Sequence, residues 1–180
     1  YHFMNEKFEI EYKTLIDSPI AYRLLSLGLF NYSGKQHNKY YDTVDNFFQN
    51  IRIVLRIREK AGKFLFTAKR ETPEGLKETE FSVDSFTGQH KKIIEYMNQF
   101  DSTLQIQEIG STLTYRYTYQ DQFGQWCLDF NVFSLSSDIE LEYELKQNVF
   151  NKKDHFLEQL KKWDIPYHSC DSKFARMKNE

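Results

Sequence analysis

Acidic residues recur at every second position in two stretches of this 180-residue chain, at Glu9 and Glu11 near the start and at Glu140, Glu142 and Glu144 near the end. Because successive side chains of a β-strand point to opposite faces, each stretch would place its carboxylates in a row. Carboxylate oxygens are the hard ligands that Mg²⁺ and Mn²⁺ prefer. The candidate metal ligands are Glu9, Glu11, Asp129, Glu140, Glu142 and Glu144.

Basic residues also occur on the charged faces of the predicted strands, and two more, Lys173 and Arg176, lie on the predicted closing helix. Arginine and lysine side chains bind phosphate oxygens through charge-assisted hydrogen bonds. The candidate phosphate ligands are Lys13, Arg56, Arg58, Lys69, Arg116, Lys173 and Arg176. An acidic set and a basic set together match a metal-chelated polyphosphate, whereas either set alone is typical of a solvated face.

The elements that must position these residues are mainly strands. Hydrophobic alternation and turn signals predict a series of strand segments, starting with the one that carries Glu9 and continuing over 39–44, 51–59, 64–71, 76–83, 104–107, 113–119, 125–133 and 138–146. Helical spacing and capping residues predict helices over 19–30 and 87–100, a third after Asn151, and a short closing helix from Asp171 or Ser172. Residues 31–38 are polar and are expected to form a loop.

The faces of the strands admit two interpretations. In most soluble sheets the apolar face packs on the core and the polar face meets water. Here the helices need an apolar surface to cover, and the polar faces are rich in Arg, Lys, Asp and Glu. If the sheet closes, the charged faces point into its lumen, and closure also removes exposed edge strands. Such a lumen would be a wet tunnel for a charged ligand, because buried charges must be paired or bound to ions. A barrel for lipids would need apolar inward faces.

Composition narrows the class of protein. The formal net charge of -2 gives no basic field for binding nucleic acid or a membrane surface. The sequence shows no apolar run of bilayer length and no signal peptide, so we expect a cytoplasmic protein. Cys127 and Cys170 are expected to be reduced thiols. The length fits one domain over residues 1–180, and we expect Met4 to be the natural start, with residues 1–3 left over from an expression vector.

An ordered set of short motifs resembles one known family. These motifs are Glu9-x-Glu11-x-Lys13, Tyr40-Tyr41-Asp42-Thr43, Leu55-Arg56-Ile57-Arg58, Thr67-Ala68-Lys69, Arg116, Leu128-Asp129, Glu140-x-Glu142-x-Glu144 and Ser172-Lys173-x-x-Arg176. In this order they resemble the CYTH, or triphosphate tunnel metalloenzyme, superfamily, and within it the small bacterial proteins described as adenylate cyclase or thiamine-triphosphatase-like. The resemblance covers nearly the whole chain.

The resemblance implies a mainly β (α+β) fold, an eight-stranded antiparallel tunnel with a charged lumen and flanking α-helices. It implies that the acidic set binds Mg²⁺ or Mn²⁺ and the basic set binds a small-molecule triphosphate, with catalysis resting on Glu9, Glu11, Lys13, Arg56 and Arg58. Members also carry inward acids on the strand of Glu78 and Glu80, but the register there is uncertain by one residue. For Lys173 and Arg176, a solvent-facing tail is the alternative.

The function implied is hydrolysis of a triphosphate with release of orthophosphate, and a compact substrate such as inorganic triphosphate or thiamine triphosphate is favoured. Two alternatives stay open at this point. The same residues would serve a cyclase that makes cyclic AMP and pyrophosphate from ATP, or a module that binds a polyphosphate or nucleotide without turnover. The sequence leaves the oligomeric state open.

Overall fold

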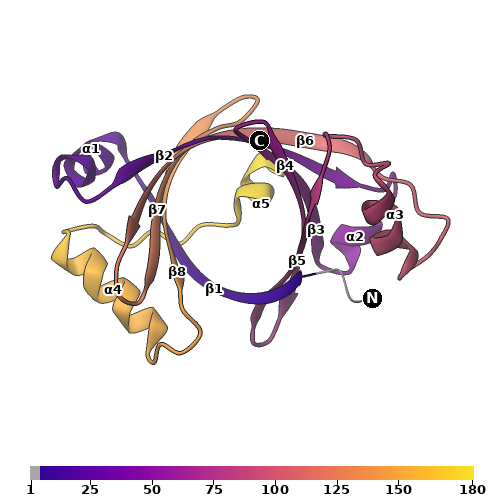
Figure 1. Ribbon diagram of the computed structural model, residues 1–180. Coiled ribbons are helices and arrows are strands. Elements are labelled where there is room, and N and C mark those ends of the chain that lie inside the picture. Colours follow the sequence, from indigo (N-terminus) through magenta and orange to yellow (C-terminus); the bar gives the residue numbers. More distant parts are fainter. Residues whose placement is uncertain (1–4) are drawn as a thin grey trace. The chain divides into compact units, whose positions relative to one another are not determined.

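A computed structural model describes residues 5–180, so the predicted start at Met4 lies outside the described residues. Its eight strands form a closed antiparallel barrel in the order β1-β5-β4-β3-β2-β6-β7-β8 (Figure 1). This confirms the predicted fold class. The strands are β1 Asn5–Ile16, β2 Asn31–Asp42, β3 Ile53–Lys60, β4 Lys63–Thr72, β5 Gly75–Val83, β6 Gln107–Gln120, β7 Gly124–Val132 and β8 Ser137–Leu145.

Five helices accompany the strands: α1 Ser18–Ser26, α2 Phe47–Asn50, α3 Lys91–Asn98, α4 Lys152–Lys162 and α5 Lys173–Lys178. The predicted starts of α1 and α5 are confirmed, because Asp17 accepts the N–H of Ile20 and Ser172 accepts the N–H of Ala175. Helix α1 is shorter than predicted. Gly28 follows its last turn with a φ of +74°, a backbone conformation that glycine adopts without steric cost.

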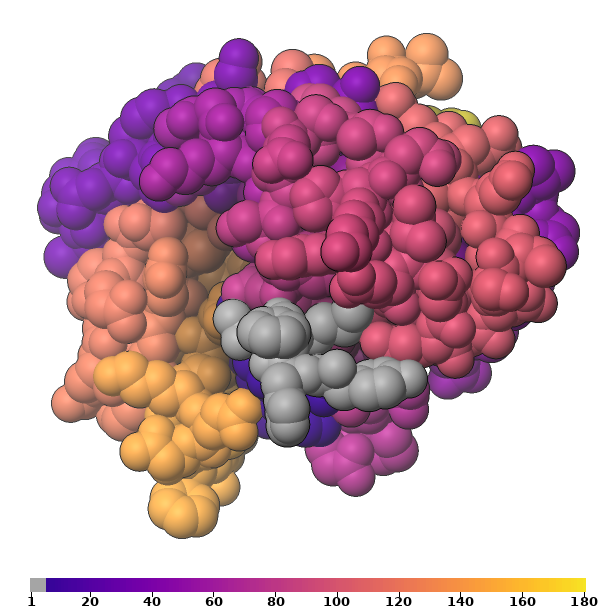
Figure 2. Space-filling view, turned by 45° about the vertical axis from the view of Figure 1, so that its right-hand side comes forward, coloured from indigo at the N-terminus to yellow at the C-terminus, as the bar shows by residue number. Residues whose placement is uncertain are grey.

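The chain divides into two compact units, which we describe separately. The first unit consists of residues 36–112, to which residues 5–8 also belong. In it, β3 pairs with β2 and β4, and β4 pairs with β5. Ile53, Leu55 and Ile57 on one face of β3 are almost completely buried, and Ile93 of α3 and Phe48 of α2 join the same core. The opposite face of β3 carries Arg56 and Arg58. The pink surface in Figure 2 shows α3 and its flanking loops on the outside of this unit.

The second unit consists of residues 9–35 and 113–180. In it, β8 pairs with β1 and β7, and β7 pairs with β6. Trp126, Leu128 and Leu141 on one face are fully buried against α1 and α4, which contribute Leu24 and Phe156 to the core. Because α1 and α4 cover this apolar face, the charged residues lie on the opposite face, which in a closed barrel is the interior face. The predicted charged lumen is confirmed for these strands.

Two segment predictions were wrong. Residues 31–38 are not a loop but the first part of β2, whose polar Gln36 and Asn38 are only 3% and 0% exposed. Interior polar side chains removed the apolar alternation that would have predicted a strand. Of the strand predicted over 104–107, residues 104–106 lie in a connection, and β6 begins only at Gln107.

None of the helices described within residues 5–180 is long and apolar enough to cross a lipid bilayer. The expectation of a single domain over residues 1–180 stays a prediction.

Candidate active site

Asp129 is the most deeply buried acid of the second unit, with no solvent exposure. Cross-strand pairing places Arg116 of β6 opposite it, and the guanidinium donates two hydrogen bonds of 2.7 Å to the two carboxylate oxygens. The ammonium of Lys173 donates a third, at 3.1 Å. Burial opposes ionisation, but Lys173 and Arg116 outweigh it and hold the pKa of Asp129 well below its ordinary value. Asp129 is therefore a fixed anion.

Lys13 of β1 lies among three carboxylates that the sequence also singled out. Its ammonium nitrogen is 3.8 Å from Glu11, 3.8 Å from Glu140 and 3.5 Å from Glu142. Burial would lower the pKa of Lys13, yet Glu140, Glu142 and Glu11 together raise it above its ordinary value. Burial raises the pKa of Glu142, and the neighbouring carboxylate of Glu11 raises it further. The single ammonium of Lys13 thus lies close to three carboxyl groups, and burial makes one of them, that of Glu142, more difficult to ionise.

Helix α5 lies on the same charged face, opposite the face that α1 and α4 cover (Figure 1). Besides Asp129, its Lys173 approaches Glu140 at 3.5 Å and donates a hydrogen bond of 3.0 Å to the hydroxyl of Thr114. Arg176 donates hydrogen bonds to Asp138 at 2.7 Å and to Glu140 at 3.0 Å. The alternative of a solvent-facing tail is wrong for these residues, since Lys173 is 9% exposed and the Arg176 side chain 12%.

The chemistry of this acidic cluster suits a divalent cation. In the second unit, this face carries more carboxylates than cations. The seven carboxylates are those of Glu9, Glu11, Asp129, Asp138, Glu140, Glu142 and Glu144, and the four cations are Lys13, Arg116, Lys173 and Arg176. All are hard oxygen donors. However, no three acid, imidazole or thiol groups within residues 5–180 are arranged to hold a metal ion. Lysine and arginine nitrogens lie between the carboxylates instead.

The first unit carries the basic candidates Arg56, Arg58 and Lys69. Arg56 donates a hydrogen bond of 3.3 Å to Thr67 and lies 4.0 Å from Glu78. Its buried Nε has no hydrogen-bond partner among the residues that the structure describes. Such an orphaned buried donor is costly unless a ligand accepts from it. Arg58 is held by a 2.8 Å hydrogen bond from its Nε to Asn38.

The register of β5 is now defined. Glu78 pairs with Lys69 and Glu80 with Thr67, so both acids lie on the face that carries Arg56. Glu78 is 3% exposed. Lys7, which approaches Glu78 at 3.8 Å and Glu80 at 3.5 Å, was missed by the sequence analysis. It could have been found, because it lies two positions before Glu9 and continues the same alternation.

Other polar residues of these clusters were also missed. Asn38 accepts from Arg58 and donates to Thr112 at 3.1 Å, and Asp138 binds Arg176. Asn38 lay in a segment expected to be a loop, so its position had no strand signal. In the motif Tyr40-Tyr41-Asp42-Thr43, Asp42 is structural: it accepts the N–H groups of Phe48 and Gln49 at the start of α2, at 3.0 and 3.1 Å.

Comparison with known proteins gives matches over nearly the whole chain. The CYTH domain matches residues 7–177. YjbK, a proposed triphosphatase of Bacillus subtilis (strain 168), is 25% identical over 186 residues, which cover 98% of this chain and 97% of that protein. The crystal structure of a proposed adenylate cyclase from Bacillus halodurans has a TM-score of 0.79 and 28% identity, covering 96% of this chain and 98% of that one. HpAC1 from Hippeastrum, a proposed adenylyl cyclase with a dominant triphosphatase activity, has a TM-score of 0.73 and 24% identity, covering 95% of each chain.

Proposed function

Because the chain belongs to the CYTH family, we propose that it hydrolyses a triphosphate with the help of a divalent metal ion and releases orthophosphate. Inorganic triphosphate and thiamine triphosphate are the favoured substrates. The observation that carries the proposal is the cluster of Glu11, Glu140 and Glu142 within 3.8 Å of one buried ammonium, that of Lys13. Similarity to YjbK supports the triphosphatase reaction.

The proposed metal ligands are Glu9, Glu11, Asp129, Glu140, Glu142 and Glu144, with Mg²⁺ or Mn²⁺ as the ion. The donor type fits, and the excess of carboxylates over cations on this face favours a further positive charge. A bound divalent ion would neutralise phosphate charge and lower the pKa of an attacking water. Lys13 would have to leave the space between Glu11, Glu140 and Glu142 to make room for the ion.

Phosphate binding is proposed for Lys13, Arg56, Arg58, Lys69 and Arg116. Arg56 supports this role best, because its orphaned Nε would donate to a phosphate oxygen. Lys173 and Arg176 bind Asp129, Asp138 and Glu140 here, so their contact with phosphate requires an exchange of partners. Hydrolysis needs no covalent nucleophile: the arginines and lysines orient the triphosphate and compensate the charge that develops on its oxygens.

The second candidate is an adenylate cyclase, in which the ribose hydroxyl of ATP attacks the α-phosphate. It is favoured by the 28% identity to the Bacillus halodurans protein, itself described as a proposed adenylate cyclase. A binding module without turnover is the remaining alternative. The same charged residues would suit the triphosphatase, the cyclase and the binding module, so these three functions are distinguished only by the products that the protein forms.

The deciding experiment is product analysis. The protein is incubated with Mg²⁺ or Mn²⁺ and, separately, with inorganic triphosphate, thiamine triphosphate and ATP. We expect orthophosphate release, and we expect Arg56→Ala to raise KM more than it lowers kcat. Cyclic AMP with pyrophosphate would establish the cyclase instead. Saturable binding without any product would contradict both enzymatic assignments.

A further inference from the structure

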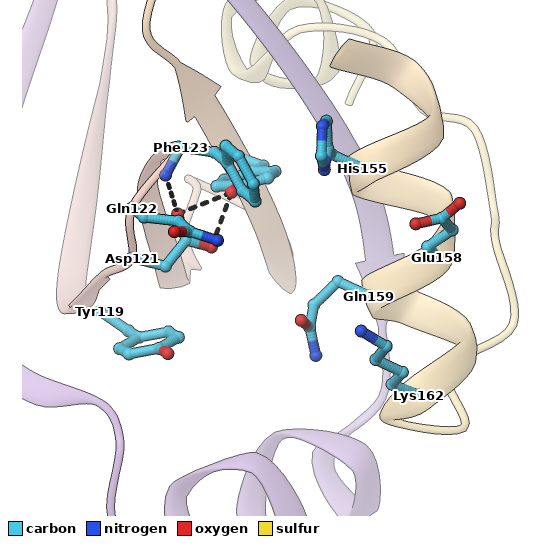
Figure 3. A pocket seen from close by; sticks show the side chains of 9 residues that line it. Tyr119, Asp121, Gln122, Phe123, His155, Glu158, Gln159 and Lys162 are labelled. Carbon is cyan, nitrogen blue, oxygen red and sulfur yellow. Dashed lines mark hydrogen bonds between the residues drawn. The ribbon is translucent and has the colours of Figure 1, made fainter. Parts of the chain in front are cut away.

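A cavity of about 410 Å³ opens on the outer face of the second unit, between the end of the β6–β7 hairpin and helix α4 (Figure 3). Its walls include Tyr119 of β6 and Tyr143 of β8. Tyr143 lies between Glu142 and Glu144 in sequence, so its side chain points away from the charged face that those acids share. The cavity is therefore separate from the candidate active site.

One wall is fixed by the carboxylate of Asp121. It accepts the N–H groups of Phe123 at 2.8 Å and Gly124 at 2.9 Å, the indole N–H of Trp126 at 3.1 Å, and the hydroxyl of Tyr143 at 2.6–2.7 Å. These donors fill the acceptor positions of a carboxylate. Gly124 has no room for a side chain, because a Cβ there would lie 2.1 Å from the carbonyl oxygen of Glu144. The hairpin end is thus a preformed wall.

The other wall is a polar stripe of α4, formed by His155, Glu158, Gln159 and Lys162. The spacing i, i+3, i+4, i+7 places these residues on one side of the helix. The opposite side is anchored by Phe156 and Leu160, which are 1% and 2% exposed. The rings of His155 and Phe123 meet with centroids 4.1 Å apart and close one end of the cavity (Figure 3). In Figure 2 the amber surface of α4 adjoins the salmon surface of the hairpin.

Several polar groups at this cavity have no partner in the protein. Within residues 5–180, the side chains of Tyr119, Glu158, Gln159 and Lys162 make no hydrogen bond and no ion pair. Glu158 and Lys162 are spaced i, i+4 in the order that favours a salt bridge, yet they form none. Figure 3 shows Gln159 and Lys162 extending from α4 toward the space in front of Tyr119 and Asp121.

These groups define the chemistry of a ligand. Two carboxylates, Asp121 and Glu158, and one ammonium, Lys162, line the cavity, so these three groups carry one negative charge in excess. This balance disfavours a polyanion such as the proposed triphosphate substrate. A neutral sugar would use the amide of Gln159 but would make no use of the two exposed charges of Lys162 and Glu158. A zwitterion satisfies both charges, because its carboxylate can accept from Lys162 and its ammonium can donate to Glu158.

We propose that this outer cavity binds a free amino acid or a short peptide of zwitterionic form. The carboxylate of the ligand lies against Lys162, Gln159 and the hydroxyl of Tyr119, and its ammonium lies toward Glu158. A volume of about 410 Å³ suits a ligand of this size, since small-molecule sites span roughly 300–1,000 Å³. The inference is independent of the proposed triphosphatase activity.

The natural tryptophans provide the readout. The chain contains only two, Trp126 and Trp163. Trp126 donates to Asp121, and the ring of Trp163 lies 6.4 Å from that of Tyr119. Fluorescence titration of the full chain with each of the common free L-amino acids, one at a time, therefore reports on this cavity. The matched probe is the N-acetyl amide of the same amino acid, which lacks both charges.

We expect at least one free amino acid to give a saturable fluorescence change and its N-acetyl amide to give none. Lys162→Met should weaken that binding by at least about tenfold, because it removes a charged hydrogen-bond donor. The matched control is Lys161→Met, which removes an exposed lysine of the same helix outside the cavity. This variant should bind the free amino acid with the same affinity as the unchanged protein.

Three results would overturn the proposal. The first is that no free amino acid binds, and the second is that binding is equally strong in Lys162→Met. The third is that the uncharged amide binds as well as the amino acid. Binding of a neutral sugar such as glucose, in the absence of amino-acid binding, would assign the cavity to a different class of ligand.

Discussion

At the scale of single residues, Asp129 shows how charge is balanced in the acidic cluster. A fully buried carboxylate is strongly disfavoured by itself, and here Arg116 and Lys173 approach it at 2.7 and 3.1 Å. Removing one member of such a group leaves the others as uncompensated buried charges. Asp129 therefore contributes to stability whether or not it also binds a metal ion.

Asp129→Asn is expected to lower the free energy of unfolding at neutral pH by about 3–5 kcal/mol, because Arg116 and Lys173 lose their buried counter-charge. Urea unfolding followed by circular dichroism measures the loss. The control is Asp154→Asn, which changes an exposed acid in the first turn of α4 and should lower the free energy of unfolding by at most about 1 kcal/mol. An Asp129→Asn protein as stable as the unchanged one would contradict the assignment of Asp129 as a fixed buried anion.

The same variant should change the pH dependence of stability. The pKa of Asp129 is lowered in the folded state, whereas an unfolded aspartate has a pKa of about 3.9. As the pH falls below about 5, the unfolded chain takes up this proton first, so the stabilisation is progressively lost. The difference in the free energy of unfolding between the unchanged protein and Asp129→Asn should therefore be largest at neutral pH and should become smaller in acid. Urea unfolding at a series of pH values measures it.

At the scale of the elements, alternation predicted the strands that have one apolar and one charged face. It placed Glu11, Lys13, Glu140 and Glu142 on one face because each row runs along a single strand. It failed for the first part of β2, where buried Gln36 and Asn38 carry no apolar signal. The partners of α5 could not be predicted either, because contacts between Arg176 and Asp138, 38 residues apart, depend on the folded arrangement.

Helix α5 has only six residues, so its position depends on side-chain contacts rather than on helix propensity. Arg176→Gln removes charged hydrogen bonds to Asp138 and Glu140. We expect amide exchange of residues 172–178 to accelerate by about tenfold or more, measured by hydrogen–deuterium exchange. Lys178→Gln, which changes an exposed lysine of the same helix, is the control. Unchanged exchange in Arg176→Gln would show that α5 is held by its other contacts.

At the scale of the whole molecule, the barrel joins elements from opposite ends of the chain. Residues Ile10 to Ile16 of β1 pair with Leu145 to Ile139 of β8, and this pairing brings Lys13 directly opposite Glu142. The acidic cluster therefore exists only in the folded chain. A ligand that binds only the folded state raises stability by mass action, so the proposed metal site has a consequence for global unfolding that does not depend on activity.

Mg²⁺ or Mn²⁺ is expected to raise the Tm of the protein in the absence of substrate. An ion at a hundred times its Kd stabilises by about 2.7 kcal/mol, which corresponds to roughly 5–10 °C in a domain of this size. Glu11→Gln should reduce the shift, because it removes a proposed ligand 3.8 Å from Lys13. In Glu6→Gln, an acid of the same strand that instead binds Lys77 at 3.1 Å, the shift should persist. Equal shifts in both variants, or none in the unchanged protein, would contradict the proposed metal site.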